Sequence, residues 1–429
     1  MTVPADRLDT AGSRTLITLS CGAFASQASI RLCDPMLPQL AADLGGTLAQ
    51  AAQTITAFAI GYGVFQLVHG PMGDRFGKLR VVSIASLAAA VASLACAFAG
   101  GLAQLVALRF FAGAACAALI PLSLAWIGDA VPYASRQRVL ARFLTGSTIG
   151  IVFGQVGGGV LADTVGWRLS FVLPAAVLLA VAAALAAQAA QAAQAAKAAR
   201  AAAAAADDGD RAPEAPTGGA REREAIARAP MRGLRAIAGQ FGSVLSSRWA
   251  RLIVAAVFVE GVLVFGAFAF VPSWLHLRYK LPLWQCGLSA GGFGIGGLAY
   301  ALASPWLIAK LGERGLMLAG AGVFAAGLLS LGNAWWPANA ASCAAAGMGF
   351  FMLHNTLQTL ATQMAPHARG TAIATFAACL FAGQSSGVAL ASSLVGSIGY
   401  ETVFFGSALS LPALAGALAL AVSRRRRAG

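Results

Sequence analysis

The chain has 429 residues, of which 58% are hydrophobic and 11% are charged, and its formal net charge is +14. A soluble domain cannot hide so much apolar surface in one core, so the composition predicts a protein that lies largely in a lipid bilayer. The basic residues stand at the edges of apolar segments, where they orient a membrane protein. This placement argues against nucleic acid as a partner.

Twelve apolar segments are long enough to cross a bilayer, which takes about 20 residues. The predicted spans are 15–38, 50–69, 81–100, 104–126, 139–161, 168–188, 250–273, 286–308, 315–334, 338–362, 371–394 and 401–422. We therefore expect an all-α membrane protein with one six-helix half over 15–188 and another over 250–422. A linker over 189–249 joins the halves, and short tails cover 1–14 and 423–429.

Lysines and arginines follow the even-numbered spans, and such loops stay in the cytoplasm. The opposite connections are mostly neutral, apart from His276, Arg278 and Lys280. This pattern predicts a multi-pass protein of the plasma membrane with both termini cytoplasmic.

The linker begins with an alanine-rich stretch, AAQAAQAAQAAKAAR. Alanine is the best helix former, so the sixth span is expected to continue as a helix beyond the membrane. Its polar residues recur every three positions and sweep around the helix, which disfavours an amphipathic, membrane-lying face. From Asp207 to about Pro230 the Pro, Gly and charge content predicts a flexible tether.

The two halves echo each other at corresponding spans. GQVGG at Gly154–Gly158 in span five recurs as GQSSG at Gly383–Gly387 in span eleven. GPMGDRFGKLR after span two has a weaker counterpart after span eight, PWLIAKLGERG at Pro305–Gly315, with Ala309 in place of the acid. These echoes indicate duplicated halves, an arrangement in which parallel repeats enclose a central substrate path.

At these motifs the sequence resembles the major facilitator superfamily over nearly its whole length. The segment after span two matches the family's signature, with Gly70, Asp74, Arg75, Gly77, Lys78 and Arg80 on its defining positions. RFFAG, from Arg109 to Gly113, resembles the helix-four signature, and DPMLPQLAADLG, which begins at Asp34, resembles the end of helix one in twelve-helix drug:proton antiporters. GIVFGQVGG, with Gly150, Gly154 and Gly158, resembles the exporters' helix-five motif, although Gln155 stands where that motif usually has proline.

The signature segment contains residue types with distinct physical roles. Gly70, Gly73 and Gly77 permit close backbone approach and a tight turn. Asp74 can accept hydrogen bonds from amides at a helix N-terminus, such as that of span eleven near Gly370. The family resemblance implies that this contact latches the halves on the cytoplasmic side. The alternative is that the basic residues merely fix the topology.

Span one carries two opposite charges, which are costly in a membrane unless they face water or protein partners. Gln27, Arg31 and Asp34 are spaced as on one helical face. Arg109 in span four lies at a similar depth and is expected to be able to pair with Asp34. The sequence leaves open whether these residues bind substrate or protons, or form a static ion pair.

Glu260 lies near the middle of span seven, with no basic residue within a turn or two along the chain. Loss of hydration favours the neutral acid there, so Glu260 is a candidate for proton uptake and release. The alternative is a permanently protonated acid with a packing role.

Span ten has Asn355 and Gln358 on one face, and Gln155 and Gln384 are equivalent glutamines of spans five and eleven. These side chains either line a polar cavity or bond between helices. His354 is expected to point away from that face. His69 is expected to be a cytoplasmic surface residue.

The sequence thus predicts a monomeric secondary transporter that exports a small, partly apolar compound in exchange for protons. One alternative is a proton symporter that imports a small organic anion, held by Arg31 and Arg109. Another is a non-transporting membrane sensor. No GxxxxGK[ST] phosphate loop, nucleophile set or metal-ligand cluster stands out, so neither an enzyme nor a cofactor is expected.

Overall fold

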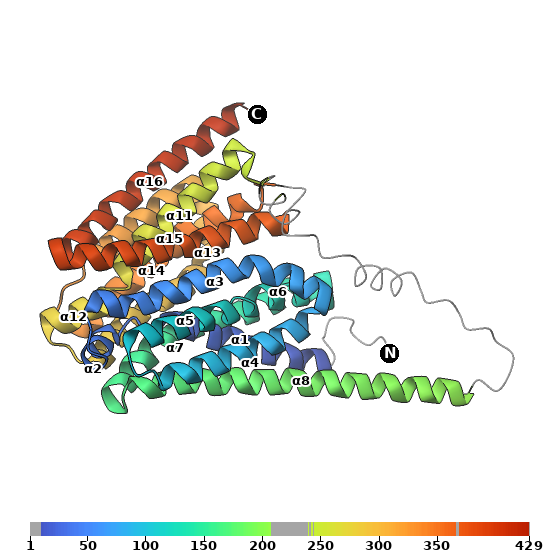
Figure 1. Cartoon of the computed structure of the whole chain (residues 1–429). Coiled ribbons are helices and arrows are strands. Elements are labelled where there is room, and N and C mark those ends of the chain that lie inside the picture. Colours follow the sequence, from blue (N-terminus) through green and yellow to red (C-terminus); the bar gives the residue numbers. More distant parts are fainter. Residues whose placement is uncertain (1–9, 207–238, 240–241, 243, 366–368, 429) are drawn as a thin grey trace.

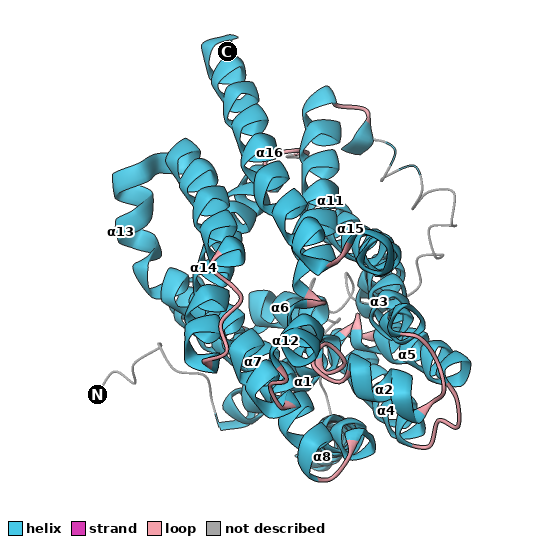
Figure 2. Cartoon of the chain, turned by 90° about the vertical axis from the view of Figure 1, so that its left-hand side faces the viewer, coloured by secondary structure: helices cyan, strands magenta, loops and turns pink. Residues whose placement is uncertain are grey.

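The computed structural model describes residues 10–206, 239, 242, 244–365 and 369–428. In these ranges the regular secondary structure is helical (Figures 1 and 2). The first half contains α1 (Thr10–Arg31), α2 (Leu37–Asp43), α3 (Leu48–Phe76), α4 (Lys78–Ala97), α5 (Leu102–Cys116), α6 (Leu119–Ala130), α7 (Tyr133–Thr164) and α8 (Trp167–Ala206). The second contains α11 (Arg248–Phe268), α12 (Val271–Tyr279), α13 (Leu283–Leu329), α14 (Trp336–Ala361), α15 (Arg369–Ile398) and α16 (Tyr400–Ala428).

Nine helical segments within the described residues are long and apolar enough to cross a membrane. One of them, α13, holds two of the predicted spans, because Gly312 with a φ of 62° breaks the helix. Helices α1 and α14 are long but more polar than the nine, and they carry several of the candidate site residues. Together these helices account for the twelve predicted spans.

Spans one and seven are each interrupted. Helix α1 ends at Arg31 and a turn over 32–36 precedes α2, while α11 ends at Phe268 two residues before α12. A proline disfavours helical geometry in the preceding residue and removes a backbone donor, and Pro35 and Pro272 lie at these two breaks. The prediction that Asp34 continues the helical face of Arg31 is therefore wrong, because Asp34 lies in the turn.

The signature segment after span two is mostly helix. Helix α3 runs through Pro71 to Phe76, and the turn into α4 is made at Gly77, whose φ is 89°. Among the three glycines for which a turn was expected, only Gly77 makes one. Gly73 is buried against Leu122 of α6, and Gly70 lies within the helix.

Glycines pack corresponding helix pairs in both halves. A side chain at Gly150, Gly154 or Gly158 of α7 would overlap the backbone of α1, and one at Gly383 or Gly387 of α15 would overlap that of α11. Gly113 of α5 packs in the same way on Phe58 of α3. The echo between GQVGG and GQSSG is thus an echo in packing.

The halves meet along two contacts, α7 with α13 and α3 with α15. Gly159 and Gly287 bring α7 and α13 together, and Tyr62 of α3 lies on Phe381 of α15 with ring centroids 4.4 Å apart. Figure 1 shows the halves close together at the end that carries α2 and α12 and diverging toward the end where α8 and α16 finish. We call the first of these the α2/α12 end.

Helix α8 continues well past the predicted limit of span six, to Ala206. This is the helical continuation expected from the alanine-rich stretch. The tether predicted from Asp207 to about Pro230 lies outside the described residues.

Candidate functional site

Asp34 and Arg31 form a buried ion pair at the break between α1 and α2. Arg31 Nη1 lies 3.5 Å from Asp34 Oδ2, with side-chain exposures of 7% and 0%. The guanidinium also lies 4.2 Å from the ring centroid of Phe265, which belongs to α11 of the other half. Such a cation over an aromatic face is attractive, most of all away from water. Arg31 therefore connects the acid of one half to an aromatic ring of the other.

Arg109 does not pair with Asp34, contrary to the sequence-based expectation. Its guanidinium donates to the backbone oxygens of Ser29, at 2.8 Å, and Thr54, at 3.4 Å, and it lies over the ring of Phe58. The side chain is buried, so these bonds hold α5 against α1 and α3. The break at Arg31 explains the difference, because it turns Asp34 back toward Arg31.

Asp34 retains an unused acceptor. Its Oδ1 is buried and has no hydrogen-bond partner among the described residues. Gln155 of α7 lies close to Asp34, yet neither polar atom of its buried amide is within hydrogen-bonding distance of a described partner. Buried polar groups without partners are rare in proteins and mark places where another group can bind.

Glu260 has a partner that the sequence did not indicate. His354 Nδ1 of α14 lies 2.9 Å from Glu260 Oε2, and the glutamate side chain is fully buried. The prediction that His354 points elsewhere is wrong. The second carboxylate oxygen, Oε1, is buried and has no hydrogen-bond partner among the described residues.

This acid–base pair can hold an additional proton without losing its hydrogen bond. With one shared proton, His354 Nδ1–H donates to a carboxylate. With a second proton, either the imidazole becomes a cation or Glu260 Oε1 becomes a hydroxyl, and the bond between Nδ1 and Oε2 persists in both cases. The pair therefore has the chemistry of a proton-binding site within an apolar span.

Aromatic rings connect the two buried pairs. Phe265, beneath Arg31, lies 5.2 Å from Phe350 between ring centroids. Phe350 in turn stacks on His354, with centroids 5.0 Å apart and an interplanar angle of 19°. Contiguous contacts thus lead from Asp34 in the first half to Glu260 in the second.

The remaining polar candidates are less enclosed or stand apart. Gln27 and Asn355 are half-buried and Gln358 is exposed. Gln384 is buried beside Gly261, and its Nε2 has no hydrogen-bond partner among the described residues. The structure therefore does not gather the span-ten amides with the two glutamines into one cluster.

The signature segment makes no contact with the other half among the described residues. Asp74 is exposed there, without a hydrogen bond or ion pair. Lys78 pairs with Asp129 at the end of α6, and Arg75 lies over Phe76. Residues 366–368, next to the start of α15, lie outside the described part. His69 is buried rather than on the surface, so that prediction is wrong.

A contact between the halves occurs instead at the α2/α12 end. Asp163, near the end of α7, accepts a hydrogen bond of 2.7 Å from the backbone amide of Trp284, in the first turn of α13. An acid at a helix N-terminus is favoured by the unpaired amides and the helix dipole. This is the type of interaction expected of Asp74, made by a different acid at the opposite end.

Two duplicated helical halves, buried charges at their interface and few polar groups elsewhere in the spans define a multi-pass membrane transporter. The comparisons with known proteins agree. The family model described as Major Facilitator Superfamily matches residues 19–388, and the chain belongs to that family. The predicted all-α fold of two six-helix halves is confirmed.

Among curated relatives, the chain is 27% identical over 172 residues to the multidrug export protein EmrB of Haemophilus influenzae, covering 40% of this chain and 34% of that protein. It is 30% identical over 154 residues to the probable actinorhodin transporter of Streptomyces coelicolor, covering 34% and 27%. The chain thus spans about a third of the length of these relatives. The crystal structure of the nucleoside transporter NupG matches with a TM-score of 0.70 at 12% identity, covering 94% of this chain and 98% of that one, which shows a shared fold.

Proposed function

We propose that this transporter exports a small, partly apolar compound in exchange for protons, with Glu260 and His354 as the proton-binding pair. The observation that carries the proposal is the hydrogen bond between these two residues inside the second half. A titratable pair within a membrane span is costly to keep and is typical of proton pathways.

Two observations favour export over the import of an organic anion. Both buried arginines already have partners: Arg31 is engaged by Asp34 and Phe265, and Arg109 by backbone carbonyls and Phe58. An anion would have to displace these contacts before a guanidinium could bind it. The relatives named above as a multidrug exporter and an actinorhodin transporter support the same direction and an apolar substrate class.

The cycle alternates between two conformations. In the structure the halves are joined at the α2/α12 end, where Asp163 contacts α13. With both termini in the cytoplasm, as the basic loops predict, this conformation is closed toward the outside. In the opposite conformation Asp74 contacts the start of α15, and the α2/α12 end separates. Protons enter the pair from outside and leave inward as the halves exchange these contacts.

Glu260→Gln tests the coupling. In everted vesicles with a proton gradient, we expect the native chain to accumulate ethidium, used as a lipophilic probe, and we expect E260Q to lose at least ten times this gradient-driven activity. Exchange of ethidium without a gradient should persist, because the glutamine retains a hydrogen bond to His354. Glu401→Gln, which removes an exposed acid that bonds to Trp274, is the matched control.

Three outcomes would count against the proposal. If the native chain does not move ethidium, export of lipophilic compounds of this kind is rejected. If E260Q keeps gradient-driven transport, the proton assignment is wrong. If E260Q loses exchange as well, the residue has a structural or substrate-binding role.

A further inference from the structure

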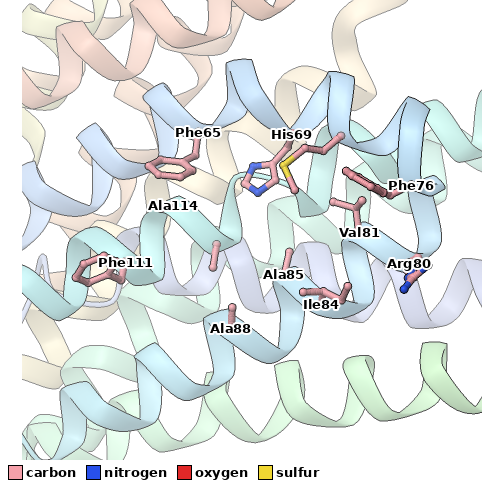
Figure 3. Close-up of a pocket in the computed structure, with 12 residues that line it drawn as sticks. Phe65, His69, Phe76, Arg80, Val81, Ile84, Ala85, Ala88, Phe111 and Ala114 are labelled. Carbon is pink, nitrogen blue, oxygen red and sulfur yellow. The ribbon is translucent and has the colours of Figure 1, made fainter. Parts of the chain in front are cut away.

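An apolar groove lies on the outer surface of the first half, between α3, α4 and α5 (Figure 3). Its volume is about 600 Å³, and phenylalanines and alanines form most of its lining. Ile84 and Phe111 on its edges are 60% and 61% exposed. Large apolar side chains that are exposed on a membrane span face lipid, so the groove opens toward the bilayer.

The groove is oriented along the membrane span. Arg80 and Phe76 lie at one end, and Ala88 and Phe111 lie at the other (Figure 3). Arg80 and Ala88 are eight positions apart on α4, about 12 Å at about 1.5 Å per residue. One leaflet of the hydrocarbon core is about 15 Å thick. The groove therefore matches the upper part of one acyl chain.

Arg80 also faces a second groove, between α1, α4 and α8, of about 750 Å³. Arg14 lines that groove together with Gln188 and Gln191 of the alanine-rich part of α8. The alanines there leave space that longer side chains would fill. Neither groove has an acidic residue in its lining. Two arginines from different helices thus meet at the depth where α1 and α4 begin.

The apolar groove contains one buried polar group without a partner. His69 is 8% exposed and points from α3 into the groove (Figure 3). Its Nδ1 forms no hydrogen bond with a described residue. The glycerol ester carbonyls of a phospholipid are acceptors that lie just below the phosphate.

We propose that an anionic phospholipid binds here, with its phosphate held by Arg80 and Arg14 and one acyl chain in the groove of Figure 3. The ester region lies toward His69. The arginines supply charge complementarity and a bidentate donor geometry for phosphate. This site is separate from the buried pairs and does not depend on the direction of transport.

Native mass spectrometry of the full chain in detergent tests the site with two lipids of identical acyl chains, phosphatidylglycerol and phosphatidylcholine. We expect tighter binding of phosphatidylglycerol. Each of Arg14→Gln and Arg80→Gln should weaken it about fivefold, because a basic residue at an anionic surface contributes about this much. Arg278→Gln, an exposed arginine at the α2/α12 end, is the matched control and should leave binding unchanged.

Filling the groove separates chain binding from charge. Ala88→Phe occupies the apolar end and should weaken both lipids, whereas Ala301→Phe, at another exposed alanine, should weaken neither. Thermal unfolding in detergent without added lipid should be alike for the two variants. Inorganic phosphate and glycerol 3-phosphate, added at millimolar concentration, should not displace the lipid.

The proposal is overturned if the two lipids bind equally, if R278Q weakens binding as much as R14Q, or if A88F has no effect. Displacement by glycerol 3-phosphate alone would instead indicate a site for a soluble phosphate compound.

Discussion

At the residue scale, Phe265 is the contact through which the two buried pairs meet. It receives Arg31 on its face and touches Phe350, so it belongs energetically to both halves. A cation over an aromatic ring contributes about 0.5–2 kcal/mol, with the larger values where water is excluded. The ring thus favours the conformation in which the break after α1 and the middle of α11 are together.

A double-mutant cycle measures this contact. We expect Phe265→Leu and Arg31→Gln to be coupled by about 0.5–2 kcal/mol in the free energy of unfolding, because either change removes the same cation–ring interaction. The readout is chemical unfolding in detergent.

Phe268→Leu with Arg31→Gln is the matched cycle, since Phe268 is a buried ring one turn away whose aromatic contact is with Phe293. Its coupling should be near zero. A coupling as large in this second cycle would mean that Arg31 acts on α11 as a whole and not through Phe265.

The buried acids could be predicted at this scale, and their partners could not. A charge within an apolar run is conspicuous, so Asp34 and Glu260 stand out in the sequence. His354 is 94 positions from Glu260, and only the packing of α14 on α11 brings them together. Helical spacing separated His354 from the polar face of Asn355 correctly, but the sequence does not reveal which face points inward. Pro35 was a readable signal for the break that turns Asp34 back to Arg31.

At the element scale, small residues determine how closely the helices approach. Gly154 of α7 packs on Ala28 of α1, and Gly383 of α15 packs on Phe258 of α11, in the same way in both halves. Without a hydrophobic driving force between helices in lipid, such close packing is a main source of association. The repeated glycine motifs therefore predicted the duplicated packing, although not which helix each would meet.

Gly154→Ala and Gly383→Ala should each lower the thermal unfolding temperature and the yield of folded protein, because the new methyl group meets backbone that cannot move aside. We expect losses of about 1–3 kcal/mol, as for other overpacked sites. Fluorescence-detected unfolding of the purified chain provides the measurement.

Gly322→Ala is the control, because space is open around Gly322 in α13. Alanine is the better helix former there by about 0.5–1 kcal/mol, so this variant should be neutral or slightly more stable. A loss equal to that of G154A would show that helix propensity or expression, rather than close packing, governs these positions.

At the scale of the whole molecule, the structure has its halves joined at one end only, and this accounts for the exposed Asp74. An acid that contacts a helix N-terminus in the other half favours whichever conformation closes that end. Asp163 makes this contact at the α2/α12 end, and Asp74 is proposed to make it at the other. The sequence indicated Asp74 through the family signature, but Asp163 has no such motif, and its role depends on where α13 begins.

The two acids should therefore act in opposite directions. Asp163→Asn keeps the shape of the side chain but removes its charge from the first turn of α13, which costs about 0.5–1 kcal/mol and raises the fraction open at that end roughly two- to fivefold. Hydrogen exchange measured by mass spectrometry should be faster over the first turns of α13. Asp74→Asn should slow or leave unchanged the exchange there, because it weakens the competing conformation, while transport falls in both variants. Asp43→Asn is the matched control, since Asp43 accepts a hydrogen bond of 3.0 Å from Trp167 Nε1 within the first half, at the same end of the molecule, and its loss should not change how the halves separate. Equal exchange in D163N and D43N would mean that the contact with Trp284 does not hold the halves together.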